Sequence, residues 1–369
     1  MGHLTHAKDE VYRLLAERLN MNPVGTPINE TLIAILHHLY TESEAKLGSK
    51  FPLFPMTLEL IASKVGIDPE PLKTMLNSMA DKGLVMDIPR KDTVYYMLTP
   101  MVVGFFEYTF MRARDNVNMK DLAELFQNYF HAQGVRDEFS GIETRIMRTL
   151  VYESILPVAV ETEILTYEKA SEIIRQSGGG AISICPCRHK AHHLGKSCGA
   201  PLEVCTSLGM AADWVIRRDM GKPATVDELL RVLDQTEKLG LVHNCDNVMN
   251  KPAYICHCCG CCCVILTGIR EFGKFGTHPS NFIPEVSSDT CVGCGTCADK
   301  CHIKAINMQD NGDGGEIPVV AKDICIGCGV CASACPTDSL TMSHRSKLHV
   351  PPNNAKDKFL RIAKEKGKI

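Results

Sequence analysis

The sequence predicts an α+β, multidomain protein with a mainly helical N-terminal half. Three observations lead to this fold class. The last third repeats a run of four closely spaced cysteines, a denser group of cysteines precedes the repeat, and the first hundred residues combine helical and strand patterns. We expect five segments, which are residues 1–100, a helical connector at 101–180, a cysteine-rich middle domain at 181–281, a module with both cysteine runs at 282–343 and a basic tail at 344–369.

Composition limits the compartment and the kinds of partner. The 369 residues are 45% hydrophobic and 22% charged, as in an ordinary globular protein. The 19 cysteines are unusual, and residues 1–20 lack the apolar core of a secretory signal, so we expect metal ligands in a reducing cytoplasm. No stretch approaches the ~20 apolar residues of a membrane span. A net charge of −3 favours neither nucleic acid nor an acidic surface as a general partner.

The first hundred residues are predicted to form helices followed by a β-hairpin. Apolar spacing predicts a short helix over residues 1–22 and a second helix that starts at Thr26-Pro27 and continues toward Gly48. Glycines, apolar periodicity and a turn then predict two more helices and two strands, at residues 57–65, 69–82, 84–88 and 93–98. This order resembles a winged helix-turn-helix domain over about residues 27–100.

The winged helix-turn-helix resemblance implies either DNA binding or protein docking. Residues 57–92 contain five Lys or Arg and six Asp or Glu, so this surface lacks the positive charge that supplies most non-specific DNA affinity. We therefore predict a docking or structural role and do not expect nucleic acid as a partner. A redox-sensing DNA-binding regulator is the alternative.

Residues 101–176 are predicted to be helical throughout, with a stretch from Ile142 that ends at Pro157. Aromatic side chains between residues 105 and 130 are expected to pack as a core rather than to hold a cofactor. The glycine run at 178–180 is predicted to cap the last helix, and residues 181–184 to form a strand.

The middle domain contains two groups of candidate metal ligands around a helical stretch at about residues 208–239. The first group supplies four thiols, enough for one metal site, and the second packs six thiols into eight residues. Six thiols so close in sequence cannot all face one cluster, so some must face the first group, another cluster or a reactive position. The candidate ligands are Cys185, Cys187, Cys198 and Cys205, then Cys256, Cys258, Cys259, Cys261, Cys262 and Cys263.

The Cys-Pro-Cys-Arg motif at residues 185–188, the stretch at 240–243 and the dense cysteine run resemble a segment of iron-sulfur proteins from anaerobic bacteria and archaea. The resemblance implies one or two additional iron-sulfur clusters, with Arg188 as a donor to cluster sulfur. Zinc is the main alternative, since His189, His192, His193 and His257 lie nearby, although each is expected to be solvated or to support a ligand. A thiol-disulfide relay is a smaller possibility.

The C-terminal module has two cysteine runs with the same spacing. The runs are Cys291, Cys294, Cys297 and Cys301, then Cys325, Cys328, Cys331 and Cys335, with Pro336 after the second. Thiolates are soft ligands that suit iron, and two-residue gaps let three of them converge on one cluster from a single tight loop. A pair of four-thiolate zinc sites is disfavoured because zinc ribbons pair two short cysteine knuckles for each metal.

These runs resemble the bacterial ferredoxins that carry two 4Fe-4S clusters, over about residues 282–342. The resemblance implies that the fourth cysteine of each run reaches the other cluster. One cluster would take Cys291, Cys294, Cys297 and Cys335, and the other would take Cys325, Cys328, Cys331 and Cys301. His302 stands where the first run would often have proline, and residues 310–315 are predicted to form a hairpin turn.

Residues 344–369 carry eight Lys or Arg against two acids. We expect a solvated, partly disordered tail, with an electrostatic docking site for an acidic redox partner as the alternative.

No motif nominates a nucleophile with its base, a dinucleotide site or a nucleotide loop, so no catalytic residue is expected. The sequence predicts a cytoplasmic electron carrier that passes single electrons through two 4Fe-4S clusters and further middle-domain clusters. Its expected partner is a redox protein, such as a flavoprotein or an anaerobic oxidoreductase complex, for which the winged-helix-like domain is the candidate docking surface. A catalytic oxidoreductase with a substrate-reducing cluster in the middle domain is a further alternative.

Overall fold

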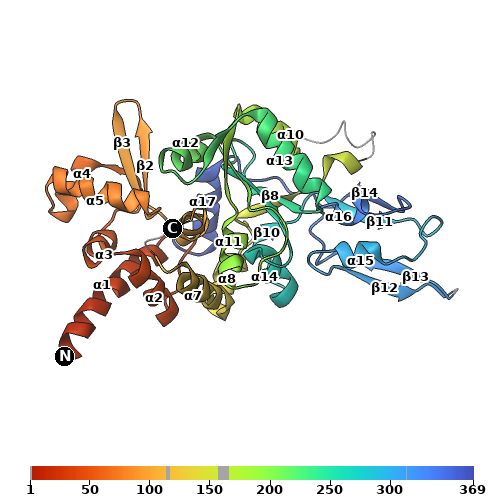
Figure 1. Ribbon diagram of the computed structural model, residues 1–369, viewed down its shortest axis with the longest axis horizontal. Coiled ribbons are helices and arrows are strands. Elements are labelled where there is room, and N and C mark those ends of the chain that lie inside the picture. Colours follow the sequence, from red (N-terminus) through yellow and green to blue (C-terminus); the bar gives the residue numbers. More distant parts are fainter. Residues whose placement is uncertain (1, 114–116, 157–165, 313) are drawn as a thin grey trace.

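The computed structural model describes residues 2–113, 117–156, 166–312 and 314–369 (Figure 1). Helices and a small sheet form the N-terminal part, a seven-stranded sheet lies at the centre, and two pairs of strands form the opposite end of the molecule. Within these ranges, no helix has the length and apolar character needed to cross a membrane.

Of the first three helices, the second and third begin where the sequence supplies a capping side chain. They are α1 (Gly2–Asn20), α2 (Glu30–Leu39) and α3 (Glu42–Ser49). The Asn29 side chain accepts a backbone hydrogen bond at the start of α2, and Thr41 forms a capping box with Glu44 at the start of α3. The single helix expected from Thr26 is therefore wrong. Two helices form instead, because the capping box starts a new helix directly after the extended residue Tyr40.

Two helices and a hairpin follow at the predicted positions. The elements are β1 (Met56–Thr57), α4 (Leu58–Val65), α5 (Pro69–Asp81), β2 (Val85–Arg90) and β3 (Thr93–Leu98). β3 lies between β1 and β2 in an antiparallel sheet. Gly66 ends α4 at a φ of 71°, and its N–H donates to the Ala62 carbonyl, as C-terminal cap glycines do.

An aromatic core joins these elements to the next segments, which are η1 (Met101–Phe105), α6 (Phe106–Phe110), α7 (Met119–His131) and α8 (Gln133–Ser140). Residues 102–104 of η1 have a non-helical backbone, so the helix expected to start at Met101 starts only after them. The ring of Phe126 on α7 lies 5.1 Å from that of Phe106 on α6, centroid to centroid. The buried side chains of this core include Phe105, Phe106, Phe110, Leu122, Phe126, Tyr129 and Phe130. The prediction that these aromatic residues pack as core is confirmed.

The central sheet has the strand order β10-β4-β8-β9-β6-β5-β7, and only the pair β10 and β4 is parallel. The strands are β4 (Met147–Leu150), β5 (Gly180–Ile184), β6 (Glu203–Leu208), β7 (Lys222–Ala224), β8 (Val242–Asp246), β9 (Tyr254–Cys258) and β10 (Thr277–His278). The helices between them are η2 (Glu153–Ile155), η3 (Thr166–Glu168), α10 (Ala170–Ser177), α11 (Pro186–His193), α12 (Gly209–Arg217), α13 (Val226–Lys238) and α14 (Val264–Phe272).

Two predictions of continuous helix are wrong. Residues 147–150 form β4, which lies between β10 and β8 with all four side chains buried. The strand contains the polar residues Arg148 and Thr149, and the apolar residues around them, at 146, 147, 150 and 151, recur at helical spacing, so periodicity favours a helix here. The stretch at 208–239 is two helices separated by β7, with a capping box between Thr225 and Glu228 that starts α13. The helix end expected at Pro157 lies outside the described residues.

Polar contacts hold the N-terminal sheet against α12. Nε1 of Trp214 donates to Asp87 on β2 over 2.9 Å. Arg218, just after α12, is largely buried and pairs with Asp87 at 2.9 Å and with Asp81 at 2.7 Å. Asp81 at the end of α5 and Asp87 on β2 therefore contact the chain's own central part.

The C-terminal module contains two strand pairs and two short helices. β11 (Phe282–Val286) pairs with β14 (Leu340–His344), and β12 (Ile306–Asp310) pairs with β13 (Glu316–Val320). The helices are α15 (Thr296–Lys300) and α16 (Val330–Ser333). The predicted hairpin at 310–315 is confirmed by the antiparallel register of β12 and β13, with residue 313 outside the described part.

The C-terminal segment is not the solvated tail that its charge predicts. Residues 355–365 form α17 (Ala355–Glu365), which packs through Ile362 in one cluster with Val24, Ile146 and Tyr254. Ile362 is fully buried, and the ammonium of Lys358 forms a buried ion pair with Asp246 on β8. Lys366 pairs with Glu138 at the end of α8. The charge count did not predict this burial, because one of the eight cations, Lys358, is itself buried on the same face of the helix as Ile362, one helical turn away.

We predict that Lys358→Met destabilises the protein strongly. The change leaves the Asp246 carboxylate buried without its cation, which costs about 3–5 kcal/mol of unfolding free energy. Arg361→Ala is the control, because it breaks the more exposed pair with Asp357 on the same helix and should change the unfolding free energy little. Urea unfolding under anaerobic conditions measures both. Equal losses would contradict the role assigned to the buried pair.

Candidate metal centres

The two C-terminal cysteine runs form matching loop-to-helix turns. Gly295 and Gly329 precede α15 and α16 at φ values of 73° and 85°, a left-handed conformation that favours glycine. Gly293 occupies the same region at 66°, and a Cβ there would come within 2.6 Å of the Glu316 carbonyl oxygen. The glycines therefore let the backbone wrap closely around the space that the cysteines surround.

The first cysteine set consists of Cys291, Cys294, Cys297 and Cys335. These four residues line one open cavity, so the structure places Cys335 of the second run with the first three cysteines of the first run. The Thr296 side chain lies 3.3 Å from the Cys294 sulfur and lowers the pKa of that thiol. Burial raises the pKa of Cys335, but hydrogen bonds from Thr337, Ser339 and Leu340 together outweigh burial and lower it overall. Burial raises the pKa of Cys297, so the surroundings favour the thiolate form at Cys294 and Cys335 but not at Cys297.

The second cysteine set consists of Cys301, Cys325, Cys328 and Cys331, which are electrostatic neighbours of one another. Burial raises the pKa of Cys325 and Cys331, and that of Cys328 to about 12. The Ala305 N–H lies 3.2 Å from the Cys301 sulfur. Buried thiolates at this density require a positive ion or cluster core to offset their charge. The first set therefore fits a metal cluster near the surface, and the second set fits a cluster in the interior.

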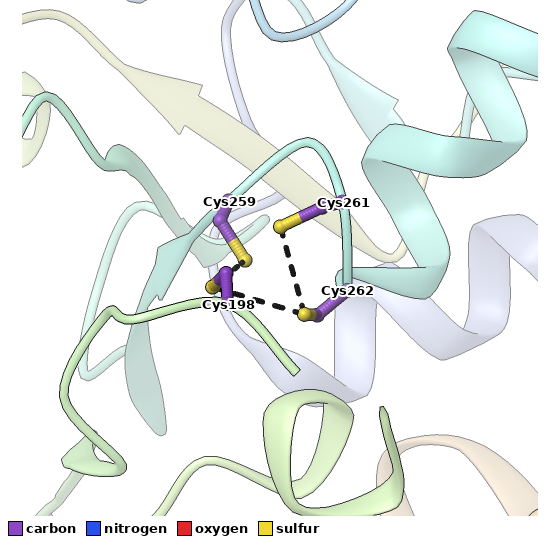
Figure 2. A group of neighbouring side chains, drawn as sticks. All are labelled: Cys198, Cys259, Cys261 and Cys262. Carbon is purple, nitrogen blue, oxygen red and sulfur yellow. Dashed lines mark hydrogen bonds between the residues drawn. The ribbon is translucent and has the colours of Figure 1, made fainter. Parts of the chain in front are cut away.

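In the middle region, the structure divides the candidate ligands differently from the two groups expected in sequence. The four-cysteine group consists of Cys198, Cys259, Cys261 and Cys262. Figure 2 shows their sulfurs pointing toward one another, and all four lie within 4.8 Å of each other. Cys198 therefore does not join Cys185, Cys187 and Cys205 in one site. The loop after β9 reaches across to Cys198, which sequence spacing could not show.

The six-cysteine group consists of Cys185, Cys187, Cys205, Cys256, Cys258 and Cys263. The Cys256 thiol interacts with Cys205 and Cys258, and Cys263 links Cys258 to Cys187. Interaction with Cys263, together with burial, raises the pKa of Cys187. Interactions with Cys256 and Cys263 lower the pKa of Cys258 to about 6. The ends of β5, β6 and β9 thus bring six thiols together in the interior.

Arg188 lies between the two groups of the middle region. Its side chain is 1% exposed, and it interacts with Cys185 and Cys259. The guanidinium donates to the carbonyls of Pro201 and His257. Interaction with the Cys262 thiol and with Arg188, against the effect of burial, lowers the pKa of Cys259 to about 3. Arg188 therefore supplies positive charge to both groups, as expected from the Cys-Pro-Cys-Arg motif.

The histidines near the cysteines make other contacts. His189 Nδ1 lies 2.8 Å from the Phe110 carbonyl, and His193 lies 3.1 Å from His189, nitrogen to nitrogen. His257 Nδ1 lies 2.9 Å from the Thr236 hydroxyl. Cys245, another middle-region cysteine, is buried in the core beside α10 and α13 and lies outside both groups.

His302 connects the four-cysteine group to the second cysteine set. It follows Cys301 directly, and its Nδ1 accepts a hydrogen bond from the Gly260 N–H over 3.1 Å. Its Nε2 lies 2.7 Å from the Gly240 carbonyl and donates to it. A Cβ at Gly260 would come within 2.5 Å of the His302 carbonyl oxygen, so the two loops are in close contact. Sequence reasoning noted His302 only as a departure from proline and missed this connection.

We predict that Gly293→Ala damages the first cysteine loop more than Gly295→Ala. Each change places alanine in a left-handed conformation, at a cost of about 1–2 kcal/mol. Only the Gly293 position adds a clash with the Glu316 carbonyl, since a Cβ at Gly295 meets no atom within 4 Å. Unfolding free energy and retained iron, measured on anaerobically purified protein, should fall further for Gly293→Ala. A larger loss for Gly295→Ala would contradict the close approach.

Comparison with known proteins identifies the C-terminal module. The sequence profile of the 4Fe-4S dicluster domain matches residues 290–339, which contain both cysteine runs. No curated protein and no solved structure matches the chain. The cavity, the glycine-lined loops and the paired thiol sets described above fit such clusters. The chain therefore carries a 4Fe-4S dicluster domain at residues 290–339, attached to a central sheet that gathers further cysteines.

Proposed function

We propose that this protein transfers single electrons through two 4Fe-4S clusters and one further cluster in the middle region. The observation that carries the proposal is the arrangement of the cysteine sets. The first set opens to the surface, where Cys294 is exposed, whereas two thiols of the second set are buried. An electron can therefore enter or leave at the first set and continue inward through the second.

The six-cysteine group supports a continuation of this path. Cys258 and Cys263 share one buried cluster of side chains with Cys325, and Cys301 and Cys328 pack against the same cluster. The group offers more than the four thiolates that one 4Fe-4S cluster takes. Nδ2 of Asn244 is buried without a hydrogen-bond partner among the described residues, and this side chain interacts with Cys258. It is available to donate to a metal-bound sulfur.

The partner in this proposal is a redox protein, such as a flavoprotein or an oxidoreductase complex of anaerobic metabolism. Val292 lies between Cys291 and Cys294, lines the same cavity, and is 68% exposed. An exposed apolar side chain beside an exposed ligand suits a transient contact with such a partner. We place the chain in the cytoplasm because iron-sulfur ligands must remain reduced.

We propose a docking or structural role for the winged-helix-like domain at the N-terminus. Asp87 and Asp81 are engaged by Arg218 of the chain's own central part. The remaining exposed face of α5 carries both acids and bases, including Glu70 and Lys73. These contacts support docking over a DNA-binding regulator, because phosphate recognition needs a positive surface.

Metal analysis and one-electron redox chemistry test the proposed function. Anaerobically purified protein should contain about twelve irons with matching sulfide, of which about eight belong to the dicluster domain. The dithionite-reduced protein should be reoxidised by a one-electron acceptor such as benzyl viologen, with loss of its EPR signal. Protein with full iron content that no one-electron donor reduces would overturn the proposal.

We predict that single ligand variants will reveal the crossed cysteine sets. Cys335→Ala should produce the same EPR change as Cys294→Ala, because both residues line the same cavity and are assigned to one cluster in this proposal. Cys301→Ala should match Cys328→Ala, because both residues are assigned to the other cluster. If each run held its own cluster, Cys301→Ala would instead change the EPR spectrum in the same way as Cys294→Ala. That result would contradict the assignment.

A further inference from the structure

The four-cysteine group has a geometry different from that of the dicluster sets. Its sulfurs lie in contact, at 3.6 Å between Cys198 and Cys259, 3.6 Å between Cys261 and Cys262, and 3.9 Å between Cys198 and Cys262 (Figure 2). In the described part of the chain, no other set of three or more potential ligands gathers within 4.8 Å. The first cysteine set instead surrounds an open cavity.

We infer that Cys198, Cys259, Cys261 and Cys262 bind a single tetrahedral metal ion, with zinc as the preferred ion. This inference goes beyond the proposed function and does not depend on it. A zinc ion holds each thiolate at about 2.3 Å, so the edges of a regular tetrahedron of sulfurs are about 3.8 Å. The three measured separations lie close to this value.

A 4Fe-4S cluster does not fit the same spacing. Each of its four irons takes one cysteine, so the cysteine sulfurs lie outside a core of irons and sulfides and must be farther apart. The four-cysteine group leaves no room for such a core without moving its loops apart. One ion bound by four thiolates also has no open coordination position, which is typical of a structural zinc site.

The surroundings offset the charge that such a site would carry. Four thiolates around a divalent ion leave a net charge of about −2, which is costly to bury without a nearby cation. Arg188 is 1% exposed and interacts with Cys259, and its Nε has no hydrogen-bond partner among the described residues. Cys259 and Cys262 are buried, whereas Cys261 is exposed and leaves a route for the ion.

The bound ion would fix the junction between the middle region and the dicluster domain. It would tie the loop at residues 259–262 to the segment that carries Cys198. That loop continues directly into Cys258 and Cys263 of the six-cysteine group, and its Gly260 contacts His302 beside Cys301. The site is therefore placed to order two iron-binding regions without itself transferring electrons.

Metal analysis of matched variants tests the inference. Anaerobically purified wild-type protein should contain about one zinc ion per chain in addition to its iron. Cys198→Ala should lose the zinc and keep the EPR signals of the dicluster domain. Cys245→Ala is the control, because Cys245 is buried outside both groups and should retain both metals. Cys261→His should also retain zinc, since imidazole is an equally good zinc ligand.

A spectroscopic measurement on the wild-type chain avoids the risk that a variant fails to fold. Protein produced with cobalt in place of zinc should show the intense visible bands of tetrahedral cobalt with thiolate ligands, and Cys198→Ala should lack them. Loss of about four irons with matching sulfide from Cys198→Ala would overturn the inference in favour of a cluster. Unchanged zinc in Cys198→Ala would overturn it as well. Failure of the proposed electron transfer would instead appear as absent one-electron reduction with zinc retained.

Discussion

The structure depends on the burial of many thiols close to one another. A buried thiolate is unfavourable, and neighbouring thiolates repel each other, so such groups persist only where a metal or a cationic side chain offsets their charge. Burial raises the pKa of Cys185, Cys325 and Cys331, which shows how strongly the protein alone disfavours their ionised forms. The free energy of cluster binding is therefore part of the folding free energy of the dicluster domain, and under the proposed function the same holds for the central part.

The central sheet serves as the common support for these sites. Its strand ends present Cys185, Cys205 and Cys258 on one side of the fold, and the Tyr152 N–H, just after β4, donates to the Cys328 carbonyl. Asp246 on β8 of this sheet pairs with Lys358 of α17. Strand β6 is followed by α12, whose Trp214 donates a hydrogen bond to Asp87 of the N-terminal sheet. Segments that are distant in sequence are thus fixed around one scaffold, which keeps the cysteine sets in a constant arrangement.

The sequence predicts most of what is local and little of what is formed by distant contacts. The dicluster domain follows from two repeated runs, and the N-terminal hairpin follows from its glycines and turn. The boundary between α2 and α3 could have been predicted from the sequence, since Thr41 and Glu44 have the spacing of a capping box. β4 was missed because the apolar residues in and beside it, at 146, 147, 150 and 151, have helical spacing. α17 was missed because the eight basic residues of the segment outnumber its few buried apolar side chains.

The candidate site shows the same division. Eleven cysteines in the middle region mark a metal-binding function, but which of them meet depends on how the loop after β9 folds back. Neither the pairing of Cys198 with Cys259 nor the position of Arg188 between two groups has a signature in linear spacing. Convergence of thiols from separate segments is a property of the tertiary structure alone.

His302 has a consequence for how this domain is attached to the rest of the chain. Proline, the residue often found at this position, has no ring nitrogen able to accept from Gly260 or to donate to Gly240. A dicluster domain with proline there would lack these two hydrogen bonds to the scaffold and would keep the backbone bond from Tyr152 to Cys328. His302 therefore adds contacts to the scaffold that are encoded separately from the cluster ligands, so this part of the attachment can change without any change in the residues that bind the clusters.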